Sequence, residues 1–207
     1  TYQMVTDKYL PVKWANGDTT WYRFGETASI YTGLYHDGSN VYYFDPYTYV
    51  TVRNDFRIAE DGQGYMFGND GKAVSGLQKW FGTYYYFDPT TYEMVRNQYL
   101  PVKWPNGDVT WYRFGSTGSI YTGLYRDGND LYYYDPSTYV TVKNDFRIAE
   151  DGNGYMFGSD GKAISGLQKW FNTYYYFQPG TYQMVRNNYI PVRWPNGETT
   201  WYMFDNT

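Results

Sequence analysis

The feature that most constrains this chain is an internal repeat of 90 residues. The segment Gly76–Asn97 (GLQKWFGTYYYFDPTTYEMVRN) returns 90 positions later as Gly166–Asn187 (GLQKWFNTYYYFQPGTYQMVRN). The last seven positions of this segment also open the chain, as Thr1–Asp7 (TYQMVTD). A fixed period is typical of repeat proteins, in which each unit is a small piece of structure that packs mainly on its neighbours. We therefore expect a single repeat array over residues 1–207. Its parts are super-repeats at 8–97 and 98–187 and partial units at 1–7 and 188–207.

Each super-repeat contains four shorter units of about 21–25 residues. One set of four is Gly76–Asn97, Gln98–Thr122, Gly123–Asn144 and Asp145–Ser165. Each unit centres on a four-residue aromatic box, and in this set the boxes are YYYF at 84–87, WYRF at 111–114, LYYY at 131–134 and GYMF at 154–157. The second box residue is always Tyr and the fourth is Phe or Tyr, whereas the first and third vary.

The segments between the aromatic runs predict tight turns. Asn16-Gly17, with copies at Asn106-Gly107 and Asn196-Gly197, lies between two runs that favour β-strand, and both residue types tolerate positive φ. No stretch shows helical periodicity. The sequence therefore predicts an all-β fold, a β-solenoid of consecutive β-hairpins stabilised by stacking on their neighbours.

Alternation along a strand gives the box residues two faces. The second and fourth residues share one face, which we expect to form the common spine. The first and third residues, such as Tyr84, Trp111, Leu131 and Gly154, are expected to line surfaces that differ between units.

Composition restricts both the core and the partners. Aromatic residues make up 24% of the chain, with 29 Tyr and 8 Trp, so the core is expected to consist of small aromatic clusters. Cysteine is absent, which excludes disulfides. A net charge of −4 argues against nucleic acid, and no apolar run is long enough for membrane insertion. Because the chain starts and stops inside repeats, we expect it to be a fragment of a longer protein.

The sequence offers little for catalysis or metal binding. Its single histidine, His36, is replaced by Arg126 in the next copy. The pairs Glu60-Asp61 and Glu150-Asp151 recur, but neighbours in a strand point to opposite faces, and Asp before Gly is ordinary turn chemistry. We expect no catalytic residue, no metal site and no cofactor, so the chain itself is not expected to be an enzyme.

Units of the form G-x-x-x-x-x-G-x-x-YYF-D-x-x-G-x-x-V-x-N resemble a known family. The likeness is carried best by Gly76–Asn97, Gly123–Asn144 and Gly166–Asn187. They look like the glucan-binding repeats in the C-terminal region of bacterial glucansucrases, within the superfamily of choline-binding and cell-wall-binding repeats. The resemblance covers essentially the whole chain. It implies a β-solenoid with ligand pockets between neighbouring hairpins, each with an aromatic platform and a polar partner. The implied platforms are Tyr42, Tyr85, Tyr132 and Tyr175, and the implied polar partners are Gln78 and Gln168.

The chain departs from the family pattern in two ways. Tyr49, Tyr92, Tyr139 and Tyr182 replace the usual Gly after the box. The WYRF and YMF units also lack the full YYF pattern, which bears on which units hold pockets. Trp80, Trp170 and Trp104 complete the candidate ligand-binding residues.

The function expected from this resemblance is non-catalytic binding of α-glucan (dextran-like) polymer by a secreted or bacterial cell-surface protein. A pyranose packs its apolar C–H face on an aromatic ring while its hydroxyls need polar partners. One alternative is a cell-wall anchoring module that binds choline or another wall polymer, although choline sites favour Trp. Another is a structural stalk or adhesin spacer without a small ligand. Basic pairs such as Arg23/Arg113, Arg53/Lys143 and Lys79/Lys169 leave an anionic polymer as a lesser possibility.

Overall fold

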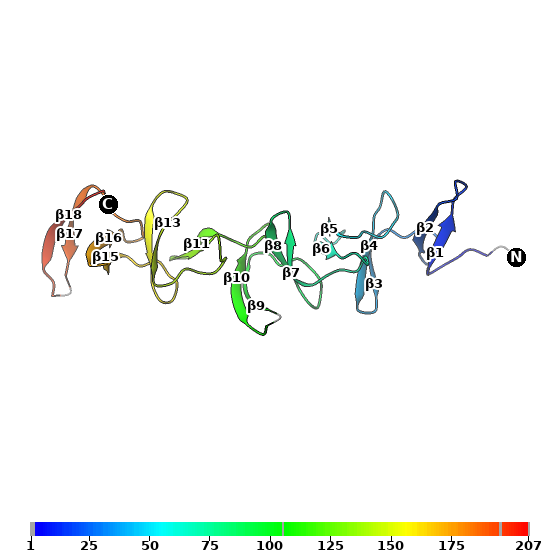
Figure 1. The fold of residues 1–207 in the computed structure, drawn as a ribbon, viewed down its shortest axis with the longest axis horizontal. Helices are drawn as coiled ribbons and strands as arrows, with labels where there is room; N and C mark the ends of the chain where they lie inside the picture. Colours follow the sequence, from blue (N-terminus) through cyan, green and yellow to red (C-terminus); the bar gives the residue numbers. More distant parts are fainter. Residues whose placement is uncertain (1–2, 105, 195, 207) are drawn as a thin grey trace. The chain divides into compact units, whose positions relative to one another are not determined.

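The computed structural model describes residues 3–104, 106–194 and 196–206, so residues 1–2 of the expected partial unit 1–7 lie outside the described residues (Figure 1). The described residues contain no helix, and their eighteen strands form nine antiparallel hairpins, each joining consecutive strands. The strands are β1 Lys8–Lys13, β2 Thr19–Phe24, β3 Gly33–Asp37, β4 Asn40–Phe44, β5 Asp55–Ile58, β6 Gly64–Phe67, β7 Gly76–Trp80, β8 Thr83–Phe87, β9 Gln98–Lys103, β10 Val109–Phe114, β11 Gly123–Asp127, β12 Asp130–Tyr134, β13 Asp145–Ile148, β14 Gly154–Phe157, β15 Gly166–Trp170, β16 Thr173–Phe177, β17 Asn188–Arg193 and β18 Thr199–Phe204. The predicted all-β fold of consecutive hairpins is confirmed.

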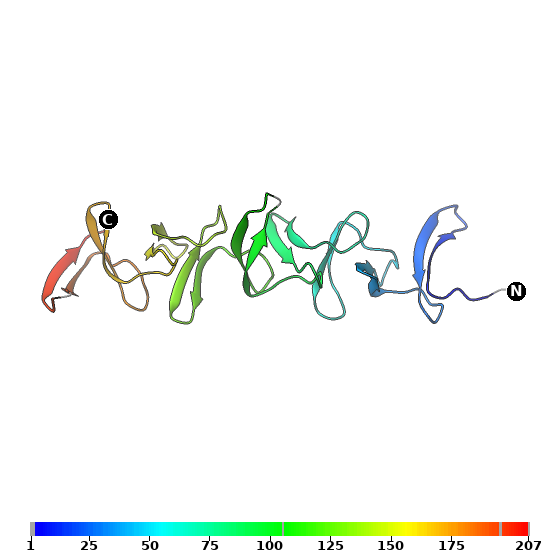
Figure 2. The ribbon, with the colours of Figure 1, turned by 90° about the horizontal axis from the view of Figure 1, so that it is seen from below.

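The hairpins belong to two compact units. Unit 1 comprises residues 1–98 and 114–120, and unit 2 comprises residues 99–113 and 121–207, in each case within the described ranges. Within each unit the hairpins follow one another in chain order (Figures 1 and 2). The grouping of the sequence into super-repeats 8–97 and 98–187 stays a prediction.

The Asn-Gly pair at Asn16-Gly17 lies in the loop between two paired strands. β1 ends at Lys13 and β2 begins at Thr19, so the loop between them is longer than a two-residue turn. Gly17 takes a φ of 94°, but Asn16 does not take positive φ. The side-chain oxygen of Asn16 instead accepts a hydrogen bond from the backbone N–H of Asp18 at 3.1 Å. The hairpin predicted at Asn16-Gly17 is confirmed, and only Gly17 of the pair uses positive φ because the Asn side chain closes the loop.

In the loop that follows each YYF box, the Tyr that replaces Gly has a left-handed backbone conformation. The four tyrosines at this position have positive φ, namely Tyr49 at 63°, Tyr92 at 64°, Tyr139 at 64° and Tyr182 at 62°. Each follows a helical-type turn closed by its own backbone N–H, as in the hydrogen bond from Tyr92 to the carbonyl of Asp88 at 2.8 Å. The tyrosine therefore adopts the left-handed conformation for which Gly is the usual residue.

The fourth box residue forms the most buried layer of the structure. Five phenylalanines at this position are the largest fully buried side chains, namely Phe67, Phe87, Phe114, Phe157 and Phe177. The fourth residue also ends its hairpin with an isolated β-bridge to the strand-like segment that follows, as between Phe44 and Thr51. The predicted spine position is confirmed for this residue.

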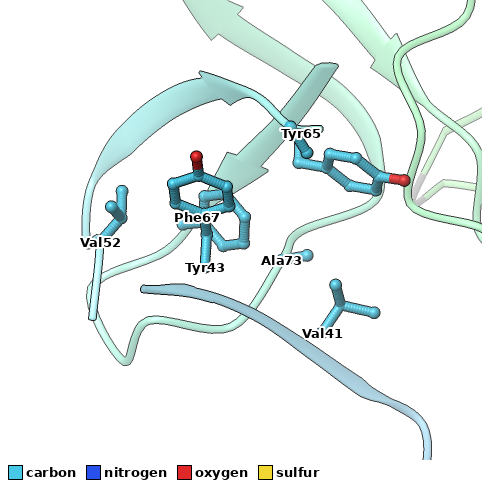
Figure 3. Close-up of a cluster of buried hydrophobic side chains, with 7 residues drawn as sticks. Val41, Tyr43, Val52, Tyr65, Phe67 and Ala73 are labelled. Carbon is cyan, nitrogen blue, oxygen red and sulfur yellow. The ribbon is translucent and has the colours of Figure 1, made fainter. Parts of the chain in front are cut away.

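The prediction that first and third box residues line surfaces that differ between units was wrong for the VYYF and LYYY units, and also for Gly154 and Met156 of the GYMF unit, which are buried. Leu131 is only 5% exposed, and Val41, Tyr43 and Tyr133 are also buried. The reason is that both faces of these hairpins are covered. Figure 3 shows Val41 and Tyr43 of β4 facing Tyr65 and Phe67 of the next hairpin. The Tyr43 and Phe67 ring centroids lie 6.1 Å apart, so the third box residue of one hairpin packs on the fourth of the next.

Candidate functional site

The four predicted platform tyrosines are more accessible than four of the other tyrosines at the same box position, whereas Tyr202 in the last hairpin is 37% exposed. Tyr42, Tyr85, Tyr132 and Tyr175 are half-buried. In the WYRF and GYMF units of the described chain, the equivalent tyrosines Tyr22, Tyr65, Tyr112 and Tyr155 are buried. The structure thus leaves part of each predicted platform ring accessible to a ligand.

Tyr42 lies in a hollow of about 260 Å³ in unit 1, and Tyr132 lies in a matching hollow of about 320 Å³ in unit 2. We call these the polar pockets. The first is lined by Tyr9, Arg23, Tyr35, Asp37, Tyr42, Phe44, Thr51, Arg53 and Asp70. The second is lined by Tyr99, Arg113, Tyr125, Asp127, Tyr132, Tyr134, Thr141, Lys143 and Asp160. Every lining residue has its counterpart 90 positions away, and only two of the nine differ in type.

Aromatic rings build the wall of each polar pocket. In unit 1, the buried ring of Phe44 contacts Tyr9 and Tyr35, each with ring centroids 6.1 Å apart. The Tyr9 hydroxyl and Thr51 Oγ1 lie 3.3 Å apart and share a hydrogen bond. These contacts come from three successive segments, so the pocket depends on the packing of β1–β2 against β3–β4.

An arginine already occupies one ring face in each polar pocket. The guanidinium carbon of Arg23 lies 4.3 Å from the ring centroid of Tyr35, within the range of a cation–π contact. In unit 2, the guanidinium carbon of Arg113 lies 3.9 Å from the ring centroid of Tyr125. The positive charge is therefore a built-in part of the wall.

The charges in each polar pocket balance. Unit 1 contributes Arg23 and Arg53 against Asp37 and Asp70, and unit 2 has Lys143 in place of the second arginine. In unit 2, burial is the main cause that raises the pKa of Tyr132, which keeps its hydroxyl protonated and able to donate. A pocket with paired carboxylates, basic groups and aromatic walls can hold a neutral, hydroxyl-rich ligand.

Tyr85 and Trp80 lie together in a second kind of hollow in unit 1, of about 330 Å³, which we call the aromatic hollow. Its other lining residues are Phe56, Ile58, Met66, Phe87, Met94, Arg96, Ser116 and Thr117. Their side chains are mainly apolar, with Arg96 as the one charged group among them.

The unit 2 copies of these two residues also lie together. Trp170 and Tyr175 both pack on the buried cluster Met156, Phe177 and Met184. The rings of Tyr175 and Phe146 are stacked, with centroids 6.5 Å apart.

The glutamines and Trp104 make local contacts. The side-chain amides of Gln78 and Gln168 donate to the backbone carbonyls of Ser75 and Ser165 at 2.8 and 2.9 Å. Gln78 pairs with Tyr85 in the hairpin register but does not line the aromatic hollow. The indole N–H of Trp104 donates to Thr110 Oγ1 at 3.2 Å within its own hairpin. A ligand role for these three residues stays a prediction.

Sequence reasoning missed several lining residues of the polar pockets. Tyr9, Tyr35, Asp37 and Asp70 were not among the candidates, although each recurs unchanged 90 residues later. This strict recurrence was the available signal. It could not be assigned to a pocket because these residues come from different hairpins.

The residues weighed for catalysis make ordinary surface and turn contacts. His36 is exposed in β3. The Asp61 carboxylate accepts hydrogen bonds from the Tyr65 hydroxyl at 2.7 Å and from the backbone N–H of Gln63 at 2.8 Å, as expected of a turn residue. Among the described residues, no group of three or more His, Cys, Asp and Glu could hold a metal ion. No helix of the described chain has the length and apolarity to cross a membrane.

Comparison with known proteins identifies the fold. No family model matches the sequence, and no curated protein matches it. Choline binding protein F from Streptococcus pneumoniae is 21% identical with a TM-score of 0.57, and the match covers 96% of this chain and 72% of that protein. The chain therefore shares the hairpin-repeat fold of choline binding protein F, which confirms the predicted resemblance at the level of the fold.

Two further structures also match. CbpJ from Streptococcus pneumoniae TIGR4 is 24% identical with a TM-score of 0.49, and the match covers 98% of this chain and 64% of that one. An alternansucrase in complex with isomaltononaose is 18% identical with a TM-score of 0.48, and the match covers 93% of this chain and 18% of that one. The chain thus spans less than two thirds of the length of either protein.

Proposed function

We propose that this chain is a non-catalytic, multivalent carbohydrate-binding module whose ligand is a neutral α-glucan polymer. The observation that carries the proposal is the polar pocket around Tyr42, which recurs around Tyr132 with the same aromatic and charged lining. In a longer protein of the glucansucrase type, such a module would hold the polymer near a catalytic domain. The proposal places the protein outside the cell or on the bacterial surface.

The chemistry of the polar pocket matches a pyranose. The exposed part of the Tyr42 ring can stack on the apolar C–H face of the sugar, as sugar sites generally combine apolar contact with a few placed polar groups. Asp37 and Asp70 can accept hydrogen bonds from sugar hydroxyls, while Arg53 can donate to them. No net charge is required of the ligand, because the pocket's own charges cancel.

Two weak pockets suffice for a polymer. A chain that is held at one pocket reaches a second pocket at high effective concentration, which raises the overall affinity without any new contact. An array that presents the same pocket in each unit is suited to a ligand that presents the same epitope many times.

The polar pockets fit choline poorly. A quaternary ammonium is bound by free aromatic faces, but the guanidinium of Arg23 already lies over Tyr35. A second cation there would meet like-charge repulsion. The same argument applies to Arg113 and Tyr125 in unit 2.

The second candidate function is cell-wall anchoring through choline or another wall polymer. The observation that favours it is the aromatic hollow, where Trp80, Tyr85 and Phe56 provide rings and Met66 and Met94 provide soft apolar contacts. The fold shared with choline binding protein F is compatible with this function. Arg96 in the same hollow disfavours a cationic ligand, so we rank this function second.

Affinity gel electrophoresis with and without dextran, alongside a choline control, tests the proposal. We expect dextran to retard the wild-type chain and to retard the Tyr42→Ala/Tyr132→Ala variant clearly less. The matched control is Tyr47→Ser, because Tyr47 is 88% exposed outside the pocket and its unit 2 counterpart is already Ser137. Circular dichroism establishes that each variant remains folded.

The outcomes separate the candidate functions. Absence of retardation of the folded wild-type chain by dextran and by other α-glucans would overturn the proposal. Choline-dependent behaviour, lost in a Tyr85→Ala/Tyr175→Ala variant, would then favour wall anchoring. If neither ligand binds, the structural stalk is the remaining function.

A further inference from the structure

Two phenylalanines are among the most exposed large hydrophobic side chains of the described residues. Phe81 is 91% exposed and Phe171 is 87% exposed. Phe81 lies at the tip of the hairpin β7–β8, and Phe171 lies at the same tip of β15–β16, 90 residues later. Their rings therefore contribute little to the buried core.

The backbone at these tips does not favour phenylalanine. Trp80 pairs with Thr83, so Phe81 and Gly82 form a two-residue turn, and both have positive φ, at 43° and 82°. Such turns favour Asn, Asp or Gly at the first position, because a larger side chain is strained there. Phe171 has a φ of 42° in the same setting. The hairpins β3–β4 and β11–β12 place Gly38 and Gly128 at this position instead.

Each tip ring continues the aromatic lining described above. The ring centroids of Phe81 and Trp80 lie 5.0 Å apart in an edge-to-face arrangement. Trp80 in turn lines the aromatic hollow together with Tyr85. In unit 2, the centroids of Phe171 and Trp170 are also 5.0 Å apart. The tip thus extends a row of rings from the hollow into solvent.

We propose that Phe81 and Phe171 are outer stacking sites for sugar residues of a glucan chain whose neighbouring residues pack on the adjacent Trp80 and Trp170 rings. The proposal rests on the proposed carbohydrate function and extends it to residues outside the pockets. A fully exposed ring at a strained position is explained by a ligand contact, because the fold itself would be better served by Asn or Gly. A polymer is required, because neither tip ring lines a polar pocket and a short ligand confined to such a pocket would not contact it.

The double variant Phe81→Asn/Phe171→Asn tests this proposal. Because Asn suits the turn, we expect an unchanged or raised melting temperature. Loss of the stacking contacts should weaken dextran binding about three- to tenfold, while binding of a short isomaltooligosaccharide stays unchanged. Phe81→Tyr/Phe171→Tyr keeps the rings and should keep the wild-type affinity for dextran.

Isothermal titration calorimetry with both ligands distinguishes the outcomes. If the wild-type chain binds dextran and the Asn variant binds it equally well, the outer stacking sites are refuted while the proposed function stands. If the wild-type chain binds no glucan, the proposed function itself fails. Wild-type binding to vesicles of neutral lipid that the Asn variant loses, with dextran binding unchanged, would assign the tips to a membrane surface and also overturn the proposal.

Discussion

One pair of residues provides an internal test of how burial controls tyrosine ionisation in this chain. Tyr134 in unit 2 occupies the position of Phe44 in unit 1, and both are 4% exposed. Their ring neighbours match, since Tyr31 lies 6.0 Å from Phe44 and Tyr121 lies 5.9 Å from Tyr134, measured between centroids. The two sites therefore differ mainly by one phenolic hydroxyl.

Burial is the main cause that raises the pKa of Tyr134 from 10.0 to about 12. Above pH 10 the unfolded chain loses this proton while the folded chain retains it. The contribution of Tyr134 to stability is therefore fully present below pH 10 and is lost as the pH rises towards 12. A shift of about 2 units corresponds to about 2.7 kcal/mol, of which about 1.4 kcal/mol is lost by pH ~11.

We expect Tyr134→Phe to remove this part of the alkaline destabilisation. The free energy of unfolding in urea, measured at pH ~8 and pH ~11, should fall about 1.4 kcal/mol less for the variant than for the wild-type chain. The reciprocal variant Phe44→Tyr should fall about 1.4 kcal/mol more, because it places a phenol in the matching site of unit 1. Parallel pH dependences for all three proteins would refute the argument that burial of this hydroxyl controls the pKa.

Three further substitutions test the packing. Phe67→Ala removes a fully buried ring and should lower the free energy of unfolding in urea by about 3–5 kcal/mol. Gly118→Ala should lower the melting temperature, because it lowers the free energy of unfolding by about 1–2 kcal/mol. Gly118 has a φ of 81°, and an added Cβ would lie 2.6 Å from Met94 Sδ. Tyr92→Gly relieves about 1 kcal/mol of backbone strain but removes a ring that packs on the core. We therefore expect the free energy of unfolding in urea to fall by a net of about 1 kcal/mol. A gain in stability would contradict the packing role of Tyr92.

Local sequence patterns were sufficient to predict the hairpins. The aromatic boxes alternate, the turns carry Gly or Asn, and the fourth box residue lies in the core, as Phe67 and Phe157 show. These features depend on residues that are close in sequence, so periodicity and turn chemistry determine them.

Coverage of the second hairpin face could not be predicted in the same way. Alternation tells which residues share a face, but the burial of Tyr43 depends on how the next hairpin packs on it. The polar pocket is another example, because Arg23 reaches Tyr35 across a hairpin boundary. The 90-residue recurrence singled out these residues. Which of them share a pocket is decided by the packing between hairpins, which the sequence pattern does not give.

The tyrosines that replace Gly after the box depend both on local backbone conformation and on packing between hairpins. Left-handed φ at a non-Gly residue costs about 1 kcal/mol, so sequence pattern alone treats Tyr92 and Tyr182 as departures. In the structure, Tyr92 packs against the buried cluster around Val41 and Tyr65, which belong to the two hairpins before β7–β8. Tyr182 packs on the matching cluster in unit 2, and its hydroxyl donates to the carbonyl of Asn129 at 3.0 Å. Burying part of an aromatic ring contributes more than the backbone strain costs, so in a chain with few aliphatic residues the loop tyrosine stabilises the core where Gly would only permit the turn.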